Sequence, residues 1–288
     1  MKKGLLAVLT LASCSAGTPS VDPSDLLVCG ADEVFILDLR AGAPKKVWSW
    51  RAADRPELPE SFRKLFGSTD DCKPVDEGRK ILISSSGGAV ALVERSTGKV
   101  LFHAAVPNAH SAEILPGNRV VAASSTKEEG NRLILFDLDK SDQPLASDEL
   151  HGAHGAVWDA ERNLLWALGE TELRAYRVEQ DRFVRKLSRT LPNPGGHDLR
   201  PVPGSPALMI TTGQHVWIFD RELLAFRTHP RIGDLAHVKS VDLDVESGAL
   251  AYVQGEKSWW AERIKFLGLD RTVEIPGAKL YKARWTNR

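Results

Sequence analysis

Four histidines recur at a nearly constant interval along this chain of 288 residues. His110, His154, His197 and His237 are separated by 44, 43 and 40 residues, and each precedes an apolar run with the character of a β-strand. A repeat of about 40 residues that holds several short strands is typical of one blade of a β-propeller. The recurrence therefore predicts a propeller in which the four side chains occupy similar places.

The strands within each repeat follow a common order. In each repeat, an apolar second strand is followed by a third strand that ends at an acidic residue, as at Asp38, Asp137 and Asp220. A more polar fourth strand comes next. Four short strands per unit make one blade. First strands are expected to begin near Asp71, His110, His154, His197, His237 and Lys279.

The two ends of the chain complement each other. Only one strand follows Lys279, whereas residues 26 to 31, 34 to 39 and 46 to 50 supply three strands with no first strand before them. Pairing the C-terminal strand with the N-terminal strands would complete the last blade and remove an exposed sheet edge. We therefore predict an all-β, six-bladed propeller over residues 25–288, with four antiparallel strands per blade.

The N-terminus has the features of a bacterial lipoprotein. Residues 1–14 are predicted to be a signal peptide, with Lys2 and Lys3 before an apolar core, and the sequence from Leu11 to Cys14 resembles a lipobox. Cys14 would then carry the lipid, which would be the only link to a membrane. The alternative is an ordinary cleaved signal peptide; both predict export.

Residues 15–24 are predicted to form a tether, because the segment is rich in Gly, Ser, Thr and Pro. Ser15, where some lipoproteins have Asp, favours the bacterial outer membrane as the destination. The 38 basic and 38 acidic residues cancel. We expect a monomer that does not bind nucleic acid, and any ligand must be recognised by a local site.

Two further cysteines, Cys29 and Cys72, remain in the mature chain. They form an even pair in an oxidising compartment, so a disulfide is permitted. Two buried free thiols are the alternative, because the sequence does not give the distance between them.

The residues at the blade starts are the candidate site. The first strand of a propeller blade lines the central channel, so these side chains should ring the channel mouth. Candidate catalytic residues are His110, His154, His197, His237, Arg200 and Lys239. Candidate substrate-binding residues are Asp71, Lys73, Glu113, Asp159, Arg284 and Trp285.

Short motifs at the blade starts together resemble a family of secreted bacterial propellers known as domain of unknown function 6528. The resemblance runs from about Asp25 to Trp285 and implies the fold and export, but no reaction. The motifs are Asp71-Cys72-Lys73-Pro74-Val75, His110-Ser111-Ala112-Glu113, His154-Gly155-Ala156-Val157-Trp158-Asp159, Gly196-His197-Asp198-Leu199, His237-Val238-Lys239-Ser240 and Tyr281-Lys282-Ala283-Arg284-Trp285.

Four interpretations of the histidines stay open. In the first, two to four of His110, His154, His197 and His237 bind one divalent ion, zinc, manganese, nickel or iron, with Glu113 or Asp71 as a possible oxygen ligand. This is similar in architecture and ligand type to oligogalacturonate lyases. In the second, a histidine acts as the base in a metal-free β-elimination of a uronate, and the carboxylate is bound by basic residues among Lys73, Arg200, Lys239 and Arg284.

The remaining two interpretations involve no reaction. The propeller could bind a glycan, another small polar ligand or a protein without changing it. Trp259 and Trp260 are consecutive, so they cannot both face one side of a strand, and one could form a lip for a ligand. Alternatively, the histidines have a structural role, and the channel cations pair with Asp159, Asp198 and Asp242.

Overall fold

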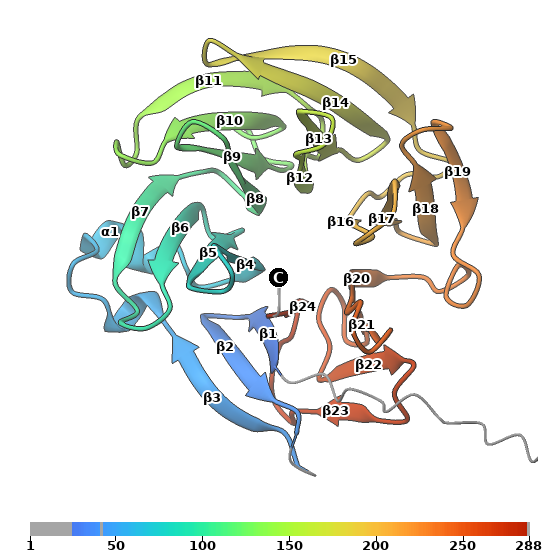
Figure 1. Cartoon of the computed structure of the whole chain (residues 1–288). Coiled ribbons are helices and arrows are strands. Elements are labelled where there is room, and N and C mark those ends of the chain that lie inside the picture. Colours follow the sequence, from blue (N-terminus) through green and yellow to red (C-terminus); the bar gives the residue numbers. More distant parts are fainter. Residues whose placement is uncertain (1–24, 41–42, 287–288) are drawn as a thin grey trace, which may run out of the picture.

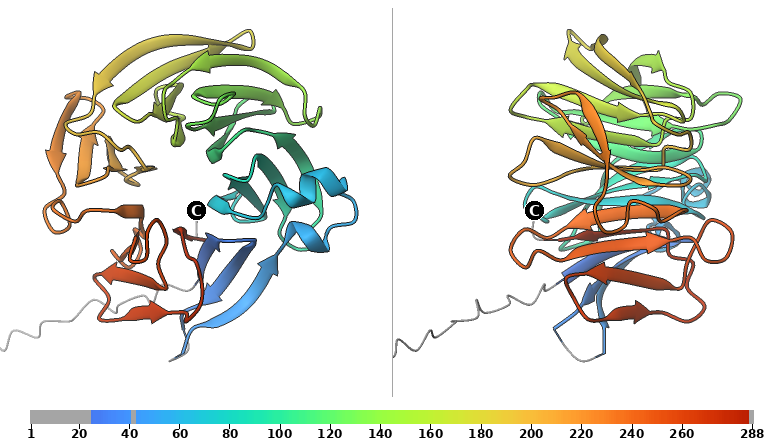
Figure 2. Two further views of the ribbon diagram at one scale, coloured as in Figure 1. Left: turned by 180° about the vertical axis from the view of Figure 1, so that it is seen from behind. Right: turned by 90° about the vertical axis from the view of Figure 1, so that its right-hand side faces the viewer.

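Six β-sheets are arranged in a ring around a central axis (Figure 1). The structure, a computed structural model, describes residues 25–40 and 43–286. Within these residues, each sheet has four strands in antiparallel order. Seen from the edge, the molecule is a disc with loops on both faces (Figure 2). The predicted all-β, six-bladed propeller is confirmed.

The first three complete blades each consist of four consecutive strands. The first blade contains β4 (Thr69–Val75), β5 (Lys80–Ser85), β6 (Ala89–Glu94) and β7 (Val100–Ala105). The second contains β8 (Ala109–Leu115), β9 (Arg119–Ser124), β10 (Arg132–Asp137) and β11 (Pro144–Glu149). The third contains β12 (Gly155–Asp159), β13 (Leu164–Leu168), β14 (Glu172–Glu179) and β15 (Arg182–Thr190).

The other blades complete the ring. The fourth contains β16 (Asp198–Pro201), β17 (Ala207–Thr211), β18 (Val216–Asp220) and β19 (Ala225–Thr228). The fifth contains β20 (Val238–Leu243), β21 (Leu250–Gln254), β22 (Arg263–Leu267) and β23 (Thr272–Glu274). The closing blade contains β24 (Lys282–Trp285), β1 (Asp25–Gly30), β2 (Glu33–Asp38) and β3 (Lys45–Trp50).

The closing blade joins both ends of the described chain. Leu26 pairs with Trp285 and Cys29 with Lys282, so β24 is the inner strand of a sheet whose other strands come from the N-terminal side. A side-chain carbon at Gly30 would come within 1.9 Å of the carbonyl oxygen of Lys279. This close approach requires glycine, and the predicted mode of closure is confirmed.

Apolar side chains fill the space between neighbouring blades. Each of the six hydrophobic clusters draws its residues from two adjacent blades, for example Phe102 with Phe136, whose ring centres are 5.9 Å apart. Side-chain burial decreases from the inner strands of a blade to its outermost strand. For example, β5 is buried along nearly all its length, whereas β15 is largely exposed. The middle strands are therefore continuous apolar runs, packed on both faces.

The connection from the closing blade to the first blade covers one of these clusters. It contains a short 3₁₀ helix, η1 (Ala52–Asp54), and α1 (Glu60–Lys64). Phe66 is buried and its ring meets Trp50 edge to face at 5.4 Å. The same cluster holds Cys29 and Cys72, which are both buried free thiols. The structure thus has the two buried free thiols that were the alternative to a disulfide.

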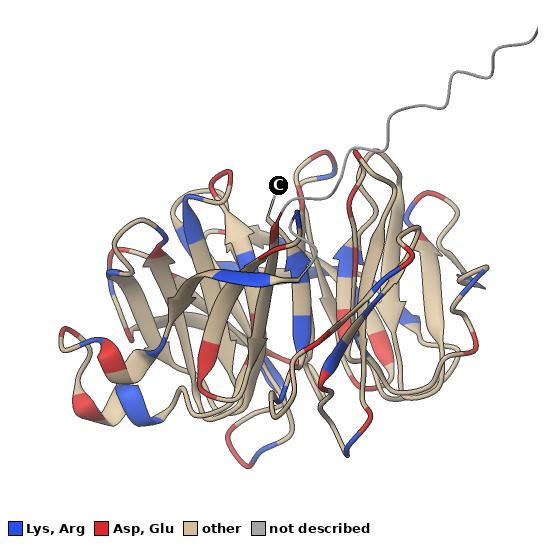
Figure 3. Cartoon of the chain, turned by 90° about the horizontal axis from the view of Figure 1, so that it is seen from below, with Lys and Arg blue, Asp and Glu red and all other residues tan. Residues whose placement is uncertain are grey.

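Basic and acidic side chains are interspersed over the disc (Figure 3). In the described part of the chain, no helix combines the length and the hydropathy that a membrane span needs. The predicted signal peptide (1–14) with Cys14, and the tether (15–24), lie outside the described residues.

Candidate functional site

The centre of the channel is filled by ion pairs rather than left open for a ligand. Arg284, on β24, donates to the carboxylates of Asp71 at 3.0 Å and Asp198 at 2.6 Å. Lys282, on the same strand, donates to Asp198 at 3.1 Å. All four side chains are buried. Together they connect the closing blade with the first and fourth blades across the axis.

Opposite charges keep these carboxylates ionised despite their burial. Burial alone would raise the pKa of Asp71, but Arg284 and Lys282 hold that pKa well below its ordinary value. The same two cations outweigh the effect of burial on Asp198 and lower its pKa to about 2. The network is therefore charged and fully paired at neutral pH.

Two other predicted ligand-binding cations also have acidic partners. Arg200 donates to Asp242 at 2.8 Å. Lys73 donates to Glu113 at 3.1 Å and to the carbonyl oxygen of Ala156 at 2.6 Å. Their charges are therefore compensated within the protein.

One face of the disc has a pocket of about 350 Å³ at the channel mouth. Each of the six blades contributes one side chain to it from the start of its inner strand. We call this set the mouth hexad: Asp70, His110, His154, His197, Lys239 and Tyr281. Of the residues predicted to meet at the channel mouth, His110, His154 and His197 line this pocket, whereas Asp71 and His237 do not.

Irregular backbone pairing aims these side chains into the mouth. In three inner strands, the pairing skips the hexad residue, which is Asp70 in β4, His110 in β8 and Lys239 in β20. In the other three blades the hexad residue immediately precedes the strand, as His154 does, and its N–H donates to Leu168 at 2.8 Å. A β-bulge redirects a side chain relative to regular pairing.

The three histidine rings lie against one another. The centres of the His110 and His154 rings are 4.1 Å apart in a stacked arrangement, and those of His154 and His197 are 5.3 Å apart, edge to face. His237 does not join them. It is exposed, and its φ of 60° lies in the left-handed region, so the chain turns before Lys239 enters the mouth.

Hydrogen bonds fix the proton positions of two histidines. The Nδ1 atom of His154 lies 2.9 Å from the carbonyl oxygen of Gly152, which only accepts, so Nδ1 carries the proton. The lone pair of His154 is therefore on Nε2. The ammonium group of Lys239 donates to Nε2 of His197 at 3.1 Å, which places the His197 proton on Nδ1.

Burial keeps the imidazoles neutral at neutral pH. It lowers the pKa of His154 to about 4 and, together with the neighbouring Lys239, that of His197 to about 2. The pKa of His110 also lies well below its ordinary value, first because of burial and then because of His154.

Two of the other ionisable groups of the mouth, Lys239 and Asp70, have pKa values near neutrality. Burial, with a further contribution from the charge of Lys282, lowers the pKa of Lys239 to about 8. Burial raises the pKa of Asp70 to about 7, although the backbone N–H of Ser86 donates to its carboxylate at 2.5 Å. Clusters of such perturbed groups in a concave site are typical of functional sites.

An exposed aromatic ring borders the pocket. Trp259 is 40% exposed, and its ring meets Tyr281 edge to face at 5.8 Å. One of the two consecutive tryptophans is therefore exposed beside the pocket, and its role as a lip for a ligand stays a prediction. Tyr281 itself is buried.

Other predicted site residues lie away from the mouth. Asp159, at the far end of β12, accepts from Arg221 at 2.6 Å. Trp285 is buried between blades, where its indole N–H donates to the carbonyl oxygen of Asp242 at 3.0 Å. Asp71, Lys73, Glu113, Arg200 and Arg284 belong to the ion pairs of the channel.

The divalent ion stays a prediction. Among the described residues, no group of three or more His, Cys, Asp or Glu side chains is arranged to hold a metal. The nearby ammonium group of Lys239 also disfavours a cation at His197. Metal analysis of the purified protein by mass spectrometry, beside a variant with both His154→Ala and His197→Ala, tests this prediction directly.

A closed ring of six four-stranded blades, with an ion-paired channel and a polar mouth, defines a six-bladed β-propeller protein. The chain belongs to DUF6528, a family of unknown function, which it matches over residues 29–287. This confirms the resemblance seen in the blade-start motifs.

Wider comparisons add only the fold. No curated protein matches this chain in sequence. Among solved structures, the chain is similar to one from the crystal structure of a nidogen/laminin complex, with a TM-score of 0.64 and 11% sequence identity. The likeness covers 90% of this chain and 97% of that one.

Proposed function

We propose that this protein is an exported, lipid-anchored propeller that binds an acidic carbohydrate at its channel mouth. The carbohydrate would have a uronate carboxylate next to Lys239 and a sugar ring against Trp259. The observation that carries the proposal is the state of Lys239, a buried cation that lacks an acidic partner within the described residues.

Lys239 differs from the other cations of the inner strands in the kind of group that it contacts. Lys73, Arg200, Lys282 and Arg284 each contact a carboxylate within 3.1 Å. In the described part of the chain, Lys239 instead contacts a neutral imidazole, that of His197. A buried charge without an opposite charge is unfavourable. A bound carboxylate would remove this cost.

The rest of the mouth suits a sugar. The apolar face of a pyranose ring packs well on an aromatic side chain, and Trp259 presents such a surface beside the pocket. Neutral imidazoles and Tyr281 offer hydrogen-bonding atoms without adding charge. The volume of about 350 Å³ lies at the lower end of the range for small-molecule sites, roughly 300–1,000 Å³.

The geometry supports binding better than elimination. An efficient general base has a pKa near the working pH. The free Nε2 atom of His154 belongs to an imidazole whose pKa is about 4, so it is a weak base at neutral pH. Incubation with acidic polysaccharides tests elimination separately, because that reaction would produce the ultraviolet absorbance of unsaturated uronates.

Calorimetric titration of the folded protein tests the binding proposal. The ligands are the trimers of galacturonate, mannuronate and glucuronate, with maltotriose as the uncharged control. We expect at least one acidic trimer to bind, and its affinity to fall more than tenfold in Lys239→Met. Lys257→Met, which removes an exposed lysine, should bind normally. Equal affinity in Lys239→Met, or no binding of any acidic trimer, would contradict the proposal.

The proposed lipid anchor has an independent test. Cells that express the full chain are grown with labelled palmitate, beside cells that express Cys14→Ala. We expect label and membrane association only in the parent protein. Unlabelled parent protein would contradict the lipid anchor and leave the binding proposal unaffected.

A further inference from the structure

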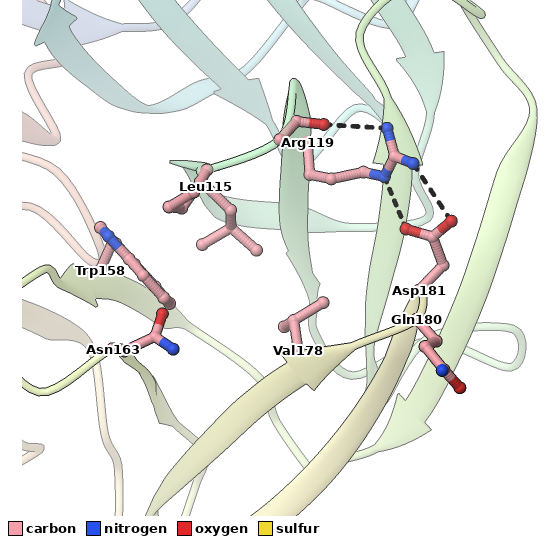
Figure 4. Close-up of a pocket in the computed structure, with 9 residues that line it drawn as sticks. Leu115, Arg119, Trp158, Asn163, Val178, Gln180 and Asp181 are labelled. Carbon is pink, nitrogen blue, oxygen red and sulfur yellow. Dashed lines mark hydrogen bonds and ion pairs between the residues drawn. The ribbon is translucent and has the colours of Figure 1, made fainter.

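A second pocket lies at the opposite end of the inner strands from the mouth hexad. It has a volume of about 330 Å³ and lies between the second and third blades (Figure 4). His110 stands at the start of β8, whereas Leu115, which lines this pocket, ends the same strand. With a rise of about 3.3 Å per residue, the two sites are roughly 15 Å apart along the channel. They therefore open on different faces of the disc.

The inner wall of this pocket is apolar. Leu115, Trp158 and Val178 line it, and all three belong to or pack against the hydrophobic cluster between these two blades. Trp158 is only partly buried, so part of its indole faces the cavity (Figure 4). The site thus presents an aromatic surface on a rigid part of the fold.

The rim is polar and held in place. The guanidinium group of Arg119 donates twice to Asp181, at 2.6 and 3.1 Å, and once to the carbonyl oxygen of Gly117 at 3.1 Å. The amide side chains of Asn163 and Gln180 complete the rim. The Arg119–Asp181 pair thus presents donors and acceptors that hydrogen bonds hold in place, and fixed polar groups are how small-molecule sites orient a ligand.

This pocket differs from the channel mouth in its charge. Arg119 faces two carboxylates, because Asp137 lies 3.2 Å from it in addition to Asp181. The lining contains one cation and one anion that pair with each other. Such a site has no free positive charge to attract a carboxylate, and it suits an uncharged polar ligand.

A second cavity lies on the other side of Trp158. The same residue lines a neighbouring pocket of about 300 Å³, between the third and fourth blades, whose lining also includes Asp159, Arg162 and Arg221. In that pocket, Arg221 and Arg162 both pair with Asp159. Trp158 is therefore a shared wall between two polar cavities. A ligand of two or more linked rings could lie across it.

We propose that the paired cavities around Trp158 bind an uncharged oligosaccharide, on the face opposite the mouth hexad. The apolar side of one sugar ring packs against the indole. The Arg119–Asp181 pair and the amide of Asn163 bind its hydroxyl groups. This site does not depend on the function proposed for the mouth.

Saturation-transfer NMR on the folded protein tests the proposal with four named probes: cellotetraose, chitotetraose, maltotetraose and xylotetraose. Two variants target the site. Trp158→Leu removes the aromatic face but keeps an apolar side chain. Asn163→Gly removes the amide and suits the backbone, because Asn163 has a φ of 53°. Trp48→Leu is the matched control, because Trp48 lies on β3 of the closing blade and lines neither these two cavities nor the channel mouth.

We expect transfer to at least one tetrasaccharide, reduced at least fivefold in Trp158→Leu and Asn163→Gly and unchanged in Trp48→Leu. Circular dichroism and melting temperature establish that each variant is folded; if Trp158→Leu unfolds, the exposed Asn163→Gly change still decides. No transfer to any probe overturns the proposal. Transfer that survives both site variants, or is lost in Trp48→Leu instead, also overturns it.

Discussion

The chemistry of the mouth depends on which residues burial leaves charged. Three imidazoles are held neutral, whereas Lys239 keeps its charge at neutral pH with a pKa of about 8. The hexad therefore combines the positive charge of Lys239 with three neutral imidazoles and with Asp70, whose pKa of about 7 leaves its carboxyl partly ionised at neutral pH. Two measurable pH effects follow from this difference.

Binding of an acidic ligand should weaken in base. The charged form of Lys239 is present below its pKa of about 8 and is lost as the pH rises through that value. If only the charged form binds, affinity should fall about tenfold per pH unit above 8. Calorimetry from pH 6 to 10 measures this. Lys239→Arg should bind equally across the range, because arginine keeps its charge; a parallel decline would indicate that another group titrates.

Acid should destabilise the fold through His154. Its pKa is about 4 when folded and 6.5 ordinarily, so the unfolded chain binds more protons between these values and stability is lost as the pH falls below 6.5. Between pH 7 and 5 this contribution is about 2 kcal/mol. In His154→Asn, whose amide can still donate to Gly152, urea unfolding should show a correspondingly smaller loss. Identical losses in the two proteins would disprove this role.

Spacing in the sequence identified part of the hexad. His110, His154 and His197 follow from their regular interval, and Lys239 from its place near a blade start. Asp70 and Tyr281 could not be found in this way. Asp70 and Tyr281 each lie next to a residue that fits the repeat equally well. The sequence does not show which of the two neighbours points into the mouth, because a shift by one residue turns a side chain to the other face of a strand. The bulges that set this register leave no clear mark in the sequence.

At the level of elements, the closing blade joins strands from the two ends of the described chain. Its inner strand comes from one end of the described chain and its outer strands from the other. The strand order of this blade was predictable from the sequence. The last repeat lacks three of its four strands, and the N-terminal segment supplies three strands that belong to no other blade. The channel ion pairs were foreseen only as an alternative, since pairing depends on distances across the axis.

The tight contact at Gly30 gives a prediction for this blade. In Gly30→Ala the added carbon would meet the carbonyl oxygen of Lys279 at 1.9 Å, so the backbones of β1 and the segment before β24 must separate. We expect a loss of roughly 1–3 kcal/mol in unfolding free energy, as for overpacking elsewhere. The matched control is Gly67→Ala, where the nearest atom is 3.8 Å away. Equal stability of both variants would refute this reason for the glycine.

At the level of the whole molecule, a few buried charges connect distant blades. Arg284 contacts Asp71 in the first blade and Asp198 in the fourth, while its own strand belongs to the closing blade. The neighbouring blades are otherwise joined mainly by apolar clusters, each of which links only two of them. The network is therefore the part of the structure that sets the blades relative to one another across the axis.

Removing Arg284 should be costly. Arg284→Met leaves Asp71 and Asp198 buried with only Lys282 as a cation, and we expect a loss of about 3–5 kcal/mol in unfolding free energy. Adding Asp71→Asn and Asp198→Asn to this variant should restore part of the stability, because the uncompensated charges disappear. Urea unfolding of the two variants measures both changes. A triple variant less stable than Arg284→Met would contradict this account.

The pairing of β1 with β24 also affects the timing of folding. Leu26 is among the first residues of the disc to be synthesised and its partner Trp285 among the last, so the contact closes a loop that contains nearly the entire fold. Such long-range pairing is slow, because the entropy of loop closure is lost before the contacts form. The ring cannot close on the ribosome until β24 has emerged. Until then β1 lacks its inner neighbour, and a nascent chain in this state is a natural substrate for chaperones.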